Sequence, residues 1–227
     1  MAALAASVIT TTAAVAQTVT LDEGAFRVSI AGKEVGTETF SIRQNGVGEG
    51  AVIIAVGRVV LVADKGPQEV SAELQVGGRT LRPAAYEVRV QGGGAERITG
   101  RVVGSRFSAQ IVSPAGESMR EYLAGEGAVL VDEGVAHHYY FLARKFEAGA
   151  TRIPIIIPRQ NRQLTAQVAV AGTERIAVAG RSLDARKLTV TPGGGGERLV
   201  WVDSDGRVLR VEIPSANFVA QRVEPPK

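Results

Sequence analysis

The chain contains no cysteine, and this absence excludes several kinds of chemistry. Without thiols there can be no disulfide bond, no thiolate ligand for zinc and no cysteine nucleophile. A lipid-modified N-terminal cysteine is excluded as well, so attachment to a membrane would need another device.

Aromatic residues, histidines and blocks of like charge are also scarce. Aromatic residues make up 5% of the 227 residues, there are two histidines, and the formal net charge is only +3. Proteins that bind single-stranded nucleic acids interleave aromatic and basic residues along a groove. Here basic and acidic residues alternate instead. We therefore expect no nucleic-acid partner, and no motif predicts a cofactor.

Residues 1–16 resemble a signal peptide. The segment is apolar, rich in small residues and free of charge, and it ends in Ala14-Val15-Ala16, the A-x-A form that precedes a signal-peptidase cut. It is short for a membrane span and lacks the usual basic start. We expect export to the periplasm or the cell exterior, with any membrane association made through a partner. Whether the leader is cleaved or retained stays open.

The remaining chain, 17–227, predicts a single β-rich domain. Short runs of Val, Ile and Leu recur between turn signals such as Asn45-Gly46, and Phe26, Val28 and Ile30 alternate with polar residues. Many closely spaced strands of this kind favour antiparallel meanders over βαβ units. The predicted fold is mainly β, with one or more curved antiparallel sheets of meander hairpins, as a half-barrel or a sandwich, packed on one short α-helix.

Two glycine runs and an acidic turn are interpreted as hairpin connections. The runs at 91–97 and 192–198 each lead into Glu-Arg and a strand, whereas a phosphate-binding P-loop leads through Gly-Lys-Ser/Thr into a helix. Their similarity also hints at a duplicated hairpin. At 203–206 a calcium loop would need a closing Glu, but that position is Pro214, so Asp205-Gly206 predicts a tight turn.

The stretch 134–148 is the convincing helix of the mature chain. Val135, Tyr139, Leu142 and Phe146 fall on one face at helical spacing, and Gly149 supplies the C-terminal stop. Such a helix would cover the concave apolar face of a curved sheet. Its apolar residues are therefore either plain core or the lining of a ligand groove.

Both histidines, His137 and His138, lie in this stretch. Adjacent residues do not converge on one ion, and the i, i+4 pair that binds metals on a helix is missing, so no metal site is expected. There is no G-x-S-x-G nucleophile motif. Asp132 or Glu133 could orient a histidine. We expect a non-enzyme, with a hydrolase using His137 or His138 as an alternative.

The segment 152–158, RIPIIIP, is an apolar run with two prolines. Proline cannot donate to a sheet ladder, so this strand is expected to lie at an edge or to break the pairing, and as an apolar edge it either packs under the helix or meets a partner. Basic residues gather around it. The candidates for binding an acidic protein or an anionic lipid head group, with plain solvation of the charges as the alternative, are Arg144, Lys145, Arg152, Ile155, Ile157, Arg159 and Arg162.

Two hairpin motifs carry a family resemblance. The first, G-x-x-x-G-x-E-x-F, uses Gly32, Gly36, Glu38 and Phe40, and the second, W-x-D-x-D-G-R-x-L-R-V-E, runs from Trp201 to Glu212. The layout resembles uncharacterised β-rich bacterial envelope proteins and is broadly similar to half-barrel lipoprotein carriers of the LolA/LolB type. The resemblance implies a curved sheet around a helix, and it carries over no catalytic residue.

Two functional hypotheses follow. The first is a non-catalytic exported binding protein, an accessory or structural subunit docked on the periplasmic side of a membrane protein complex, for example a respiratory or photosynthetic assembly. The alternative is a periplasmic carrier that holds a lipid or another apolar ligand in the half-barrel. A carrier requires an unfilled cavity between the sheet and Tyr139, Leu142 and Phe146.

Overall fold

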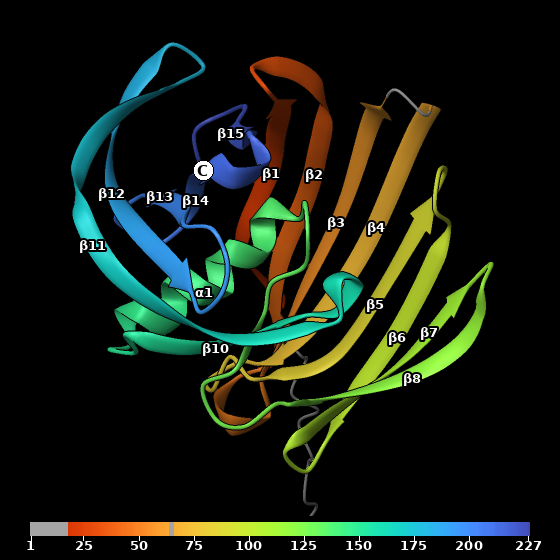
Figure 1. Cartoon of the computed structure of the whole chain (residues 1–227). Coiled ribbons are helices and arrows are strands. Elements are labelled where there is room, and N and C mark those ends of the chain that lie inside the picture. Colours follow the sequence, from red (N-terminus) through yellow and green to blue (C-terminus); the bar gives the residue numbers. More distant parts are fainter. Residues whose placement is uncertain (1–17, 64–65) are drawn as a thin grey trace, which may run out of the picture.

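The computed structural model describes residues 18–63 and 66–227, so the signal-peptide-like segment 1–16 lies outside the described residues. Within them one sheet of 15 strands curves around a single α-helix (Figure 1). The strands are β1 Thr18–Ile30, β2 Lys33–Asn45, β3 Val52–Ala63, β4 Gly66–Gly77, β5 Pro83–Gln91, β6 Glu96–Val103, β7 Arg106–Ser113, β8 Gly116–Leu123, β9 Val129–Leu130, β10 Arg152–Ile157, β11 Arg162–Val178, β12 Arg181–Pro192, β13 Arg198–Val202, β14 Val208–Ile213 and β15 Phe218–Arg222.

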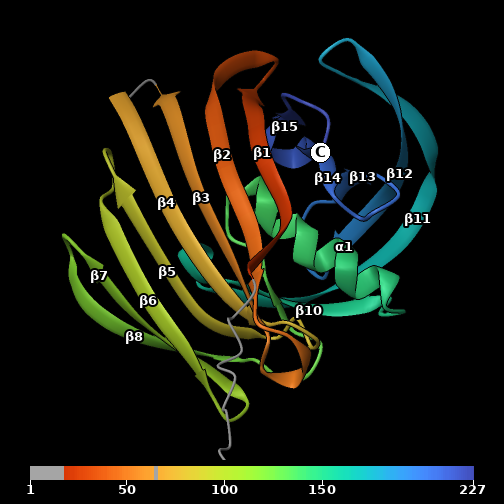
Figure 2. The ribbon, with the colours of Figure 1, turned by 180° about the vertical axis from the view of Figure 1, so that it is seen from behind.

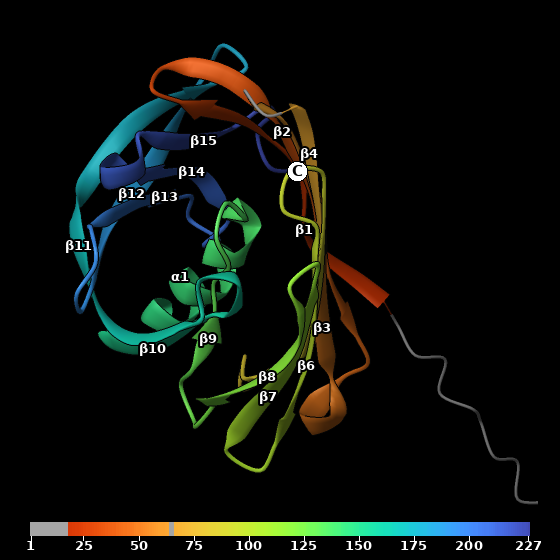
Figure 3. The ribbon, with the colours of Figure 1, turned by 45° about the vertical axis from the view of Figure 1, so that its right-hand side comes forward.

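The strand order shows two meanders that join at the chain's ends. It runs β8-β7-β6-β5-β4-β3-β2-β1-β15-β14-β13-β12-β11-β10-β9, so β1 pairs with β15 and the two halves become one sheet. Neighbours are antiparallel except β9 and β10, which form a short parallel pair. The strands β10 to β15 arch over the helix and β1 to β8 form the facing wall (Figure 3). The mainly β fold with a curved antiparallel sheet is confirmed, as one sheet whose edges are β8 and β9.

The sheet forms because apolar residues alternate along the strands. In β5 the side chains of Tyr86, Val88 and Val90 are buried and those between them are more exposed. The hairpin turn between β1 and β2 is formed by Ala31 and Gly32, whose φ of 50° and 78° are the left-handed values that a tight hairpin requires. The two glycine runs connect β5 to β6 and β12 to β13, as predicted.

The predicted helix is present but its start differs. Helix α1 spans Tyr139–Glu147 and follows a 3₁₀ turn, η2 Ala136–His138, so the predicted range 134–148 contains both. Val135 is extended, and Gly149 with φ of 97° follows the C-terminus as expected. Seen from behind, α1 lies inside the curve of the sheet (Figure 2).

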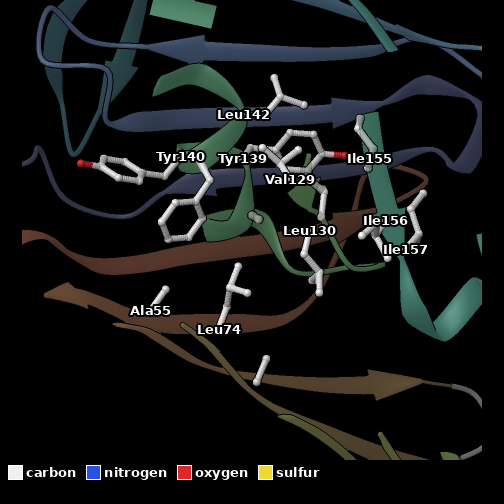
Figure 4. Packing of buried hydrophobic residues seen from close by; sticks show 14 of the residues in the cluster. Ala55, Leu74, Val129, Leu130, Tyr139, Tyr140, Leu142, Ile155, Ile156 and Ile157 are labelled. Atoms are coloured by element: carbon white, nitrogen blue, oxygen red, sulfur yellow. The ribbon is translucent and has the colours of Figure 1, made fainter. Parts of the chain in front are cut away.

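The apolar face of α1 is packed against the sheet. Tyr139 is 4% exposed and Leu142 is 0% exposed, and both belong to the same buried cluster as residues from both halves of the sheet. Figure 4 shows them with Ile155 in this packed region. Val135 is also buried, whereas Phe146, near the end of the helix, is only half-buried. These residues therefore act as core.

Of the two alternatives for 152–158, packing under the helix is confirmed, and an exposed apolar strand that meets a partner is wrong. Ile155 and Ile157 are at most 1% exposed, so neither can meet a partner at the surface. The strand β10 lies between β9 and β11, and α1 covers its inner side. Pro154 is tolerated because β9 pairs only with Ile155 and Ile156, so the sheet ends beside the proline.

Candidate functional site

A buried glutamate joins the sheet to the start of the helical segment. Glu38, on β2, is 0% exposed. Its carboxylate accepts hydrogen bonds from the backbone N–H of Ala136 (2.8 Å) and of His137 (3.0 Å), and it lies 2.6 Å from Nδ1 of His137. The N–H groups at the start of a helical turn have no partner within the turn, so this carboxylate satisfies them. Glu38 therefore fixes η2 to the sheet.

The ring of His137 is held between other parts of the first motif. It stacks on Phe40, with ring centroids 5.6 Å apart and an angle of 3° between the planes. On β3, a Cβ atom on Gly57 would lie 2.3 Å from Cε1 of His137, so only glycine leaves room for the ring. Glu38 and Phe40, two residues of the G-x-x-x-G-x-E-x-F motif, thus contact one buried histidine. The motif positions the helical segment.

A second buried network surrounds His138. Nδ1 of His138 accepts a hydrogen bond from the backbone N–H of Asp132 (3.1 Å), which places the ring proton on Nε2. The carboxylate of Asp132 accepts hydrogen bonds from the hydroxyl of Tyr86 (2.6 Å) and from Nε of Arg159 (3.0 Å). Burial raises the pKa of Tyr86 well above its ordinary value, so its hydroxyl remains a donor. The network connects β5, η2 and η3, the 3₁₀ turn Pro158–Gln160.

Both histidine rings are enclosed by the protein. His137 and His138 are at most 1% exposed, and Nε2 of each has no hydrogen-bond partner among the described residues. No serine or threonine contacts either ring through a hydrogen bond in the described part of the chain. Residues 18–63 and 66–227 also contain no group of three or more histidine or acidic side chains that could hold a metal ion. A general base must reach the proton that it removes, and these rings do not reach solvent.

Asp132 or Glu133 was expected to orient a histidine through its carboxylate, but the carboxylate in contact with a histidine ring is that of Glu38. Asp132 contacts His138 through its backbone N–H, and its carboxylate is occupied by Tyr86 and Arg159. The carboxylate that orients a histidine is Glu38, which is 99 residues away from His137 in the sequence.

The buried imidazole of His138 predicts a loss of stability in mild acid. Its burial, and then the nearby His137 and Arg159, hold its pKa well below the ordinary value. In the unfolded chain the residue titrates near pH 6.5. Below that pH the unfolded state binds a proton that the folded state does not, so the free energy of unfolding falls by up to about 1.4 kcal/mol per pH unit. Urea unfolding between pH 8 and pH 5 measures this slope.

The matched variant is His138→Asn, whose side-chain oxygen can replace Nδ1 as acceptor but does not titrate. We expect it to be less stable than the wild type at pH 8 and to lose less stability between pH 8 and pH 5. An unchanged slope would show that His138 does not cause the acid sensitivity.

Most of the basic residues proposed for partner binding already have partners within the chain. Arg159 is paired with Asp132, Arg144 with Glu147 (2.8 Å), and Arg162 donates to the carbonyl of Gly194 (3.0 Å). Nζ of Lys145 donates to the carbonyl oxygen of Thr80 (2.5 Å), and Arg152 is exposed. Since Ile155 and Ile157 are buried, these residues do not make the mixed apolar and basic surface that we expected.

The β8 edge of the sheet presents unpaired backbone groups, which the sequence did not identify. The backbone N–H of Ala124 donates to the carbonyl of Ser105 (2.7 Å), just beyond β8 and β7. Bonded and non-bonded residue pairs alternate in an antiparallel ladder. The bonded residue of β8 therefore alternates, counting back from Ala124, and residues an odd number of positions before it are not bonded to β7. In this register the N–H and C=O groups of Glu117, Met119 and Glu121 point away from β7. Among residues 18–63 and 66–227, no strand pairs with this outer side of β8 (Figure 1).

A side chain already occupies one end of this edge. Leu123 has the same orientation as Met119 in the ladder. Its backbone N–H donates to Oε1 of Gln163 (2.8 Å), and its carbonyl accepts from Nε2 of the same side chain (2.5 Å). A side-chain amide thus pairs with the edge as the backbone of another strand would. The hydroxyl of Tyr122, also on β8, donates to Oδ1 of Asn161, which directly precedes β11 (3.1 Å).

The outer face beside this edge carries exposed apolar side chains. Met119 and Leu123 are each 61% exposed, and Val103 on β6 is 73% exposed. They lie among charged residues, including the pair Arg106 and Glu121 (3.1 Å). The edge therefore combines unpaired backbone, apolar side chains and charges. Such charges oppose uncontrolled pairing between edges.

Comparisons with known proteins add a likeness in shape. No protein-family model matches the chain, and no curated protein matches it. A solved structure that is similar is that of a beta-barrel-like protein of the domain of unknown function DUF1849 from Brucella abortus. It is 10% identical, and the alignment covers 91% of this chain and 98% of that chain with a TM-score of 0.48. The resemblance to half-barrel lipoprotein carriers stays a prediction, and function is argued from this chain's own residues.

Proposed function

We propose that the chain is a non-catalytic exported binding protein, an accessory subunit docked on the periplasmic side of a membrane protein complex. In this proposal the β8 edge receives an extended segment of the partner protein, which adds a strand to the sheet. The observation that carries the proposal is the double hydrogen bond between Gln163 and Leu123, because it demonstrates the geometry of strand addition at one position. Glu117, Met119 and Glu121 continue the same row of outward backbone groups.

A membrane location would come from the partner. Among the described residues, no helix is long and apolar enough to cross a membrane. The N-terminal segment 1–16 supports export by its sequence alone. The exposed Met119 lies between Glu117 and Glu121 along the edge, and Arg106 already pairs with Glu121, so a partner segment with an apolar centre fits best.

A non-catalytic role is supported by the enclosure of both histidines, which are the residues that a hydrolase would need. The carrier alternative needs space under α1. There Leu142 and Ala143 are 0% exposed and packed in the core cluster, so a lipid would have to displace side chains to enter.

A proline at Met119 tests the proposal. The N–H of Met119 points away from β7, so Met119→Pro removes an edge donor while leaving the β7 ladder intact. Met119→Ala removes the apolar side chain and keeps the donor. We expect native mass spectrometry of gently extracted protein to find the wild type and the alanine variant in a larger assembly. The proline variant should dissociate from the assembly. Its affinity for the partner should fall by about tenfold or more, because one backbone donor is lost from a ladder that excludes water.

Two results would contradict the proposal. One is a proline variant that stays in the assembly as well as the alanine variant does. The other is a solitary chain with a lipid-sized adduct that is lost on denaturation, which would favour the carrier.

A further inference from the structure

A small cavity lies where several turns meet near the start of α1. Its volume is about 160 Å³. Its walls come from the loop 131–134, from η3 and the start of β11, from the glycine run 192–196, and from η4, the 3₁₀ turn Pro214–Ala216. Pockets that enclose a whole drug-sized molecule usually span about 300–1,000 Å³. This one has room for a single functional group.

Arg198 lines this cavity. Arg198, the first residue of β13, lies two and four positions before Val200 and Val202, whose side chains are buried in the core. The alternation of a strand therefore directs Arg198 to the inner face. Its Nε and Nη1 atoms are buried and have no hydrogen-bond partner among the described residues. The residue as a whole is partly exposed, but two buried guanidinium nitrogens without an acceptor are costly, so these two atoms favour an acceptor in the cavity.

The surroundings of Arg198 favour a negative ligand. Arg162 and Tyr139 also line the cavity. Burial raises the pKa of Tyr139 to about 12, against the opposing effect of Arg198, so at neutral pH its hydroxyl is a donor. Of the acidic residues at the cavity, Asp132 is neutralised by Arg159, and Glu133 is exposed to solvent.

The glycine run allows the walls to approach closely. A Cβ atom on Gly196 would lie 2.4 Å from Oγ of Ser215, so a side chain there would push η4 away. The carbonyl of Gly194 accepts a hydrogen bond from Arg162, which holds the run beside the cavity. The interpretation of this run as a hairpin turn was right, but the turn also forms a wall of the cavity.

We propose that this cavity binds the oxyanion of a small ligand, a carboxylate or a phosphate group, through Arg198 with Arg162 and Tyr139. No residue of β8 lines the cavity, and this proposal does not depend on the docking proposal. Guanidinium groups bind both kinds of oxyanion through charge-assisted hydrogen bonds.

Titration calorimetry of the full chain tests this site, with inorganic phosphate and acetate as probes. The decisive variant is Arg198→Gln. The matched control is Arg97→Gln, because Arg97 follows the other glycine run in the same way but pairs with Glu87 (3.0 Å) at 53% side-chain exposure. We expect at least one probe to bind the wild type and the control with equal affinity. Its affinity for Arg198→Gln should be lower by about tenfold or more.

The outcomes separate the two ligand classes. Binding of phosphate alone identifies a phosphate site, and binding of acetate alone identifies a carboxylate site. The proposal is overturned if neither probe binds at concentrations on the order of 10 mM, or if Arg198→Gln binds like the control. If Arg198→Gln does not unfold cooperatively, Arg162→Gln, at an exposed position, replaces it and must weaken binding.

Discussion

Replacing Glu38 by alanine is expected to lower the free energy of unfolding by about 3–5 kcal/mol, because it leaves several buried donors unsatisfied at about 1–3 kcal/mol each. The variant leaves the N–H groups of Ala136 and His137 without an acceptor, and Nδ1 of His137 loses its 2.6 Å contact. None of these groups can turn to water, because the segment is buried. Chemical denaturation measures the loss.

The matched control lies on the same strand. Glu34 pairs with Arg27 at 3.1 Å, but both side chains are more than half exposed. Glu34→Ala should change stability by about 0–1 kcal/mol, as exposed pairs do. Equal effects of the two substitutions would mean that Glu38 does not hold η2 on the sheet.

The second large effect is expected at the seam between the first and last strands. Asp22 on β1 accepts hydrogen bonds from Nη1 (2.9 Å) and Nη2 (2.7 Å) of Arg222 on β15, and both side chains are at most 3% exposed. Asp22→Ala leaves Arg222 buried without its counter-charge. We expect a loss of about 3–5 kcal/mol, measured by chemical denaturation. At the exposed pair of Arg175 and Asp184, Asp184→Ala should cost about 0–1 kcal/mol.

Burial raises the pKa of Asp22, even though Arg222 beside it acts in the opposite direction. The ion pair is therefore not a strong net stabiliser, and the damage comes from leaving one charge alone. It follows that Asp22→Ala combined with Arg222→Met should be more stable than Asp22→Ala by itself. A double variant that is less stable than the single one would contradict this explanation.

The local part of the fold could be predicted from the sequence because it depends on neighbours along the chain. Alternating residues such as Tyr86, Val88 and Val90 indicate strands, and glycines at left-handed positions indicate hairpins. The helix was predictable from its apolar face. The acidic turn at Asp203 was predictable too: its carboxylate accepts from the backbone N–H of Asp205 (3.0 Å) and of Arg207 (2.8 Å).

Features that depend on distant strands were not predictable. The contact of Glu38 with His137 joins residues 99 positions apart, and the β8 edge is defined by the strand order. The isoleucines of 153–157 were candidates for an exposed edge strand, because a proline-flanked apolar run is typical of such strands. In the structure the short strand β9 pairs with Ile155 and Ile156, so β10 is not at the edge. The inward direction of Arg198 could have been found from its spacing to Val200 and Val202.

The two motifs behind the family resemblance have structural roles. Glu38 and Phe40 of the first hold His137. In the second, Nε1 of Trp201 donates to Glu174 (2.9 Å), and the indole packs with Leu209 on the outer face of the sheet. Both motifs therefore specify the fold, and the functional proposals rest on the β8 edge and on the cavity at Arg198.

Hydrogen exchange at single amides along β8 tests the docking proposal most directly. The comparison is between the isolated protein and the assembly extracted from the host membrane. We predict that the amides of Glu117, Met119 and Glu121 exchange rapidly in the isolated protein and at least about tenfold more slowly in the assembly. The amides of Ser118 and Arg120, which face β7, should be protected in both and serve as internal controls. Equal exchange of the three edge amides in the two samples would contradict strand addition at β8.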